Sequence, residues 1–191
     1  FTGFLLVSPI IATGLYAVSR ALERGEQPTL LDALRIWRPN DGRLIVFGLL
    51  LAFAGTGWVM TSASLITGFA SAPVNGPADF LRVVVLAPQG YLFEAWLAMG
   101  GVLAAPVFAS SVVAIPLLLD RPQANVIDAI ATSFRTVQTN FAPMLFWAVL
   151  IAGFSAAGLA TLYLGLIVTL PLIGHATWHA YRDLVSFPGE S

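Results

Sequence analysis

The sequence predicts an all-α fold, a polytopic bundle of transmembrane helices, and its composition is the first reason. Hydrophobic residues make up 58% of the 191 residues, charged residues only 10%, and the mean hydropathy is +0.84. Soluble proteins carry about a quarter charged residues, so a chain with so few charges cannot cover a surface that faces water. Most of this surface must therefore face lipid, and membrane lipids are the first expected partner.

Charge-free runs are the second reason, and they mark the spans. These runs cover 1–19, 44–78, 95–119 and 136–181. A helix needs about 20 apolar residues to cross the hydrocarbon core. The last run would form a helix of about 69 Å, more than twice the core thickness, so we expect a hairpin that turns near Gly158–Gly165. Five spans follow, over roughly 1–19, 44–69, 91–119, 142–160 and 164–184.

The arginines are the third reason, and they orient the spans. All nine basic residues are Arg, and Arg82 alone falls on one side of the predicted membrane. The positive-inside rule puts the other eight in the cytoplasm. We therefore expect a multi-pass protein of the bacterial cytoplasmic (inner) membrane with a cytoplasmic C-terminus. The eight are Arg20, Arg24, Arg35, Arg38, Arg43, Arg121, Arg135 and Arg182.

The two cytoplasmic connections open with the same capping pattern. Thr29 is followed three positions later by Asp32, and Asn125 by Asp128. The cap oxygen can accept from the third helical N–H, and the Asp can reach back or favour the positive end of the helix dipole. Each motif opens an amphipathic stretch too short and too charged to span, so we expect interfacial helices over roughly 29–38 and 125–139. In the second stretch the predicted apolar face consists of Ile127, Ile130, Ala131, Phe134 and Phe141.

The order of span, surface helix and span occurs twice along this single domain of residues 1–191. Residues 1–69 and 91–160 therefore form a possible parallel internal repeat. Helix-cap chemistry alone is the other explanation of the likeness.

His175 and His179 are the only histidines, and they are weak candidates for a metal site. Spaced four apart, they share one helical face, but Ala stands where a zinc protease needs Glu. One helix cannot supply both axial ligands of a haem, and the chain has no third His. We expect a hydrogen-bonded structural pair and no bound metal or cofactor. Asp120, Asp128 and Asp183 lie on the same side of the predicted membrane and could serve as the partner of His175.

Small residues recur four apart within the spans and permit helices to approach closely. We expect most of this packing to occur within the chain. The small residues are Gly100 with Ala104, Gly101 with Ala105, and Gly153 with Ala157.

No charged residue lies in the central part of a span, and no grouping has the pattern of a catalytic site, so we expect a protein that is not an enzyme.

Three segments carry a resemblance to a known family. The ending 170–182, which contains Gly-His-Ala-Thr-Trp-His-Ala-Tyr-Arg, together with segments 116–121 and 14–20, resembles a proteobacterial family of integral membrane proteins of unknown function, DUF2189. The resemblance implies six spans, with a polar cytoplasmic region and one extra span ahead of Phe1. It carries no activity and no catalytic residues over to this chain.

These patterns favour a non-catalytic protein that works by association. We expect an accessory or assembly subunit of a larger inner-membrane complex, with a respiratory or photosynthetic electron-transfer complex as host and other membrane subunits as partners. The net charge of −1 offers no footprint for nucleic acid. One alternative is a small-solute transporter or channel, and a second is a haem- or metal-handling protein that uses His175 and His179.

Overall fold

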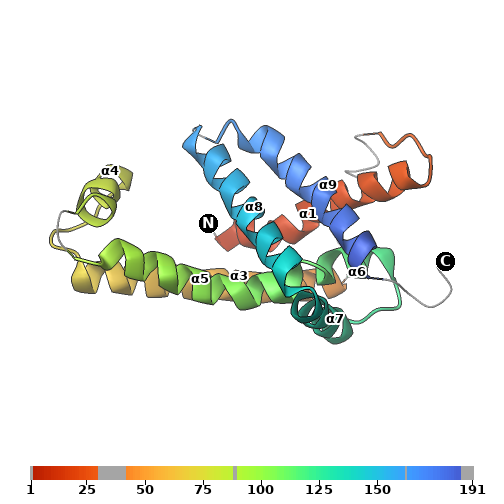
Figure 1. Ribbon diagram of the computed structural model, residues 1–191, viewed down its shortest axis with the longest axis horizontal. Helices are drawn as coiled ribbons and strands as arrows, with labels where there is room; N and C mark the ends of the chain where they lie inside the picture. The colour runs from red at the N-terminus through yellow and green to blue at the C-terminus, as the bar shows by residue number, and fades with distance from the viewer. Residues whose placement is uncertain (1, 30–41, 88–89, 162, 186–191) are drawn as a thin grey trace.

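A computed structural model describes residues 2–29, 42–87, 90–161 and 163–185, with side chains from residue 13 onward. Every regular element within these ranges is helical, which confirms the predicted all-α class (Figure 1). Residues 30–38, which include Asp32 and most of the first predicted interfacial helix, lie outside the described ranges. The helices are α1 Thr2–Glu23, α3 Gly42–Phe69, α4 Pro77–Phe80, the π-helix η1 Leu81–Val85, α5 Leu92–Ser111, α6 Ala114–Asp120, α7 Val126–Thr139, α8 Phe141–Ala160 and α9 Leu166–Leu184.

Three helical stretches in the described part of the chain are long and apolar enough to cross a membrane. They cover Gly42–Phe69, Leu92–Asp120 and Phe141–Ala160. Protein buries only 17%, 33% and 11% of their most apolar stretches, respectively, as expected for helices whose other faces contact lipid. The second half of α9 is more polar, because it carries both histidines, Arg182 and Asp183. The count of five spans stays a prediction.

A break divides the predicted third span, which was expected to be one helix over 91–119. Helix α5 ends at Ser111 and α6 begins at Ala114. Pro116 explains the break, because it has no N–H to donate to the carbonyl of Val112 and its ring crowds that carbonyl. The N–H of Val113 instead donates to Ser133 Oγ of α7, at 3.1 Å.

Helix α6 is the centre of the hydrophobic core. Residues 112–118 are buried without interruption, although they read in the sequence as the end of a lipid-facing span. Trp178 and Tyr181 of α9, Phe47 of α3 and Met144 of α8 belong to the same buried cluster. Helices α1, α3, α5, α7 and α9 all pack against α6 (Figure 1). The apolar helix α6 is therefore surrounded by other helices of the protein rather than by lipid.

Two glycines set the close crossing of the α8–α9 hairpin. A Cβ added to Gly165 would lie 2.9 Å from the Cα of Gly158, so the two backbones touch there. Thr161 holds the turn: its hydroxyl donates to the Gly158 carbonyl at 2.9 Å and accepts from the Gly165 N–H at 2.8 Å. Tyr163 adopts a positive φ of 68° in the same turn.

Asn125 caps α7. Its Oδ1 accepts from the backbone N–H of Asp128 at 2.8 Å, and its Nδ2 donates to Asp128 Oδ2 at 2.6 Å. Asp128 therefore reaches back to the cap side chain rather than to the cap backbone. The buried face of α7 consists of Ala129, Ser133 and Thr136.

The exposed side of this region carries part of the predicted apolar face. Ile127 is 79% exposed and Phe141, which belongs to α8, is 63% exposed. Small side chains on the buried face of α7 explain this arrangement, because they permit a close approach to α5 and α6. Whether this exposed side lies in the membrane interface stays a prediction.

Candidate functional site

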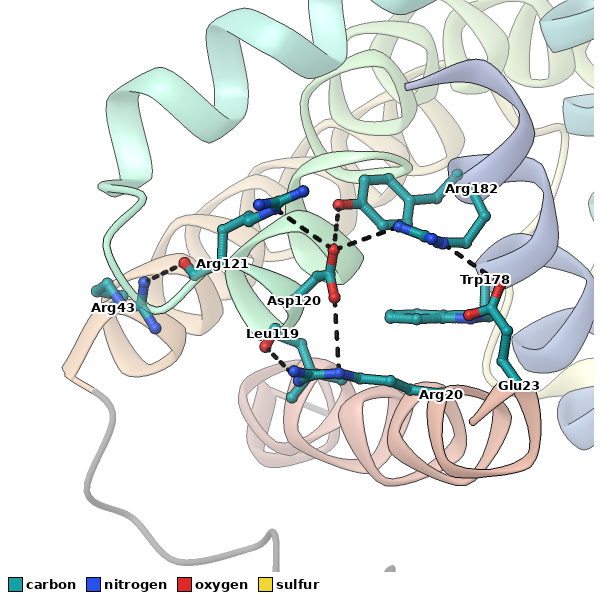
Figure 2. Close-up of polar contacts among 9 residues, drawn as sticks. Arg20, Glu23, Arg43, Leu119, Asp120, Arg121, Trp178 and Arg182 are labelled. Carbon is teal, nitrogen blue, oxygen red and sulfur yellow. Dashed lines mark hydrogen bonds and ion pairs between the residues drawn. The ribbon is translucent and has the colours of Figure 1, made fainter. Parts of the chain in front are cut away.

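A cluster of charged side chains gathers where α1, α6 and α9 end together (Figure 2). Asp120, the last residue of α6, lies at its centre, and only 12% of its side chain is exposed. Three guanidinium groups surround its carboxylate at N–O distances of 3.6 to 3.8 Å. The Tyr181 hydroxyl donates to Asp120 Oδ2 at 3.0 Å. The three cations are Arg20 of α1, Arg121 and Arg182 of α9.

Glu23 is the second acidic group of the cluster. It lies in the last turn of α1 and accepts from Trp178 Nε1 at 3.2 Å and from Arg182 Nε at 3.3 Å. Arg182 therefore joins both carboxylates. These contacts tie the end of α1 to the end of α9, two segments more than 150 residues apart in the chain.

Arginines also satisfy the carbonyl groups at the end of α6. The last carbonyls of a helix have no partner within it and attract cations. Arg43, in the first turn of α3, donates to the carbonyls of Leu118, Arg121, Pro122 and Ala124 at 2.6 to 3.1 Å. Arg20 Nη1 donates to the carbonyl of Leu119 at 3.2 Å (Figure 2).

The cluster lines an open polar cavity of about 350 Å³. Four guanidinium groups and two carboxylates line it, a net charge of 4 − 2 = +2. Such a cavity suits an anion better than a cation or an apolar ligand. The lining residues are Arg20, Glu23, Arg24, Asp120, Arg121 and Arg182.

The histidine pair does not belong to this cluster. His175 Nδ1 lies 2.5 Å from Ser19 Oγ of α1, and that hydroxyl also donates to the Leu15 carbonyl at 3.2 Å. The expectation of a carboxylate partner for His175 is therefore wrong, because the close packing of α1 on α9 brings a serine there first. His179 is exposed. In the described part of the chain, no three His, Asp or Glu side chains come together as metal ligands would.

The small residues predicted to pack helices divide into two groups. Gly100 lies against α3, where an added Cβ would come within 3.1 Å of the Trp58 ring. The others lie on exposed faces of α5 and α8, and a Cβ added to Gly101 or Gly153 would meet no atom within 4 Å. The exposed members are Gly101, Ala104, Ala105, Gly153 and Ala157.

The sequence contains a signal for the charged cluster. Arg20, Asp120 with Arg121, and Arg182 each stand where an apolar run ends, and the arginine split puts all three ends on one side. Helix ends on the same side of a bundle lie close together, so Asp120 is expected to pair with the arginines at the neighbouring helix ends. The role of Arg43 has no such signal, since it depends on how α3 packs against α6.

The helical architecture, with long exposed apolar helices and charges gathered at the helix ends, is that of an integral membrane protein. A family model described as "Predicted integral membrane protein (DUF2189)" matches residues 1–120, and the chain belongs to that family. The ending 170–182 lies outside the matched residues. No curated protein and no solved structure matches the chain.

Proposed function

We propose that this protein is a non-catalytic membrane protein that works by association, as an accessory or assembly subunit of a larger complex of the bacterial inner membrane. One observation carries the proposal: small-residue faces on α5 and α8 that the chain's own helices leave uncovered. Gly101, Ala104 and Ala105 on α5 are exposed, as are Gly153 and Ala157 on α8.

Lipid tails are as apolar as the helices, so helices in a membrane associate through close packing at small residues rather than through a hydrophobic driving force. Gly100 illustrates this within the chain, because it accepts the Trp58 ring of α3. One helical position further, the face of Gly101 and Ala105 offers the same close approach to a helix from another subunit.

The polar groups of the described part support the same reading. Asp120, Glu23 and the guanidinium of Arg43 are engaged in contacts that hold helix ends together, and His175 contacts Ser19. These groups stabilise the fold, which leaves the lipid-facing helices as the surface on which a partner would act. We take a respiratory or photosynthetic electron-transfer complex as the host to test first.

The test is purification from native membranes in a mild detergent, followed by mass spectrometry. We expect the chain to copurify with the subunits of one complex, and Gly101→Leu combined with Ala105→Leu to lose them. The matched control is Val102→Leu, which enlarges a neighbouring side chain that is 71% exposed without filling the small-residue face. Equal copurification of the double variant and the control would contradict the proposal.

A second result would replace association with transport. If deletion of the protein abolished uptake of one solute, and the purified protein in liposomes moved that solute, the transporter alternative would be correct. Stoichiometric haem or metal that His175→Ala removes would support the third alternative.

A further inference from the structure

We propose that the cavity between the ends of α1, α6 and α9 binds the phosphate group of an anionic ligand. Its source is either the headgroup of an anionic lipid or a soluble phosphate compound. The inference is independent of the proposed association, because it depends on side chains at the helix ends and not on the lipid-facing helices.

The charge of the cavity is the first argument. Both carboxylates are already engaged: Asp120 by three guanidinium groups and the Tyr181 hydroxyl, Glu23 by Trp178 and Arg182. Two positive charges remain in excess on the lining. Clustered like charges repel one another, so an added anion would lower the energy of the cluster. An anion of charge −1 or −2, such as a phosphate diester or monoester, matches this excess.

The guanidinium groups on the wall of the cavity are the second argument. Arg20 Nε is buried and ion-paired with Asp120 Oδ1 at 3.6 Å, so Arg20 is held in place at the wall. Arg24 lies on the same wall, exposed, and its guanidinium contacts no acid in the part of the chain described here. Planar guanidinium groups suit phosphate oxygens because they donate two parallel hydrogen bonds.

The position of the cavity is the third argument. It lies where the ends of α1, α6 and α9 bring Arg20, Arg121 and Arg182 together (Figure 2). Basic pockets between transmembrane helices on the cytoplasmic side suit anionic headgroups. A lipid whose phosphate entered this cavity would lay its tails along the apolar half of α9, where Val168 and Leu172 are exposed.

The experiment uses the full chain in a neutral detergent, with Arg24→Gln as the variant. Arg24 is exposed and lies outside the internal ion pairs, so its replacement should leave the fold intact. The control is Arg82→Gln, which removes one Arg whose only described acidic partner is Asp79, on α4. Thermal unfolding and native mass spectrometry are measured with phosphatidylglycerol, with phosphatidylcholine, and with inorganic phosphate replacing chloride at constant ionic strength.

We expect phosphatidylglycerol or inorganic phosphate to raise the Tm above its value in phosphatidylcholine and chloride. Arg24→Gln should weaken the apparent affinity about tenfold, since it removes one charge-assisted contact, and Arg82→Gln should not. A response to phosphatidylglycerol alone would identify a lipid headgroup, and a response to inorganic phosphate without lipid would identify a soluble source. No anion-dependent change in Tm, or equal effects of the two variants, would overturn the proposal.

Discussion

Arg43 donates a hydrogen bond to the backbone carbonyl oxygen of Ala124 at 2.6 Å, across 81 positions of the chain. The same guanidinium group reaches the carbonyls of Leu118, Arg121 and Pro122. One side chain on the first turn of α3 therefore closes the end of α6 and holds the connection to α7. A helix end that packs inside a bundle needs such a partner, because its last carbonyls have no donor within the helix.

Replacing Arg43 should therefore destabilise the fold. We expect Arg43→Gln to lower the free energy of unfolding by about 2–3 kcal/mol, since it leaves carbonyl groups near the core without a donor. Arg43→Lys should recover part of the loss, because an ammonium group cannot reach four carbonyls at once. Thermal unfolding in detergent measures both. An unchanged Tm for Arg43→Gln would show that water replaces the side chain without cost.

The histidine pair should behave asymmetrically. His175→Ala should cost about 1–3 kcal/mol, because the buried side of Ser19 loses its partner. His179→Ala should change stability by less than about 0.5 kcal/mol, since the side chain is exposed. Chemical denaturation of the two variants is the measurement. Equal effects, or metal or haem at one equivalent in the purified protein, would contradict a structural role for His175.

Gly165→Ala should force the α8–α9 hairpin apart. The added Cβ would lie 2.9 Å from the backbone of Gly158, which cannot move aside as a side chain can. We expect a loss of about 1–3 kcal/mol, the usual cost of overpacking. Gly153→Ala is the matched control on α8, where the added Cβ meets nothing and helix propensity favours Ala. If both variants unfold at the same temperature, the glycine crossing does not hold the hairpin.

The arginine split predicts the orientation of the chain. A reporter fused after Ser191 should report the cytoplasm, and one inserted at Asn75 should report the periplasm. The structure puts Arg82 in η1, next to α4, at the end of α3 and α5 opposite to α6 (Figure 1). The opposite signal at either insertion site would refute the five-span topology.

Chain length and residue type predicted much of this fold, because their constraints are local. The length of the run 136–181 required two helices, and α8 and α9 occupy it with their turn between Gly158 and Gly165. Asn125 followed by Asp128 marked a helix start. Each of these features depends on the backbone within a few residues of the signal.

Tertiary neighbours were harder to predict. Ser19 and His175 are 156 positions apart, and no spacing rule selects a serine over the three available aspartates. The sequence also gave no indication that 112–118 would be enclosed by protein, since an apolar run has the same composition in lipid and in a core. Which face of α7 is buried depended on the small size of Ala129 and Ser133 rather than on hydrophobicity.

The burial of α6 shortens the apolar length that the bilayer core has to accommodate. Without the break after Ser111, Leu92–Asp120 would span about 43 Å as one straight helix, well beyond a bilayer core of about 30 Å. Helix α5 alone, with 20 residues, spans about 30 Å. The surplus apolar length is folded into the protein, and the buried residues of α3, Phe47, Gly48 and Ala52, lie in its first half. We therefore expect the chain to avoid hydrophobic mismatch without tilting in the bilayer, because the protein itself supplies apolar surroundings for the extra turns.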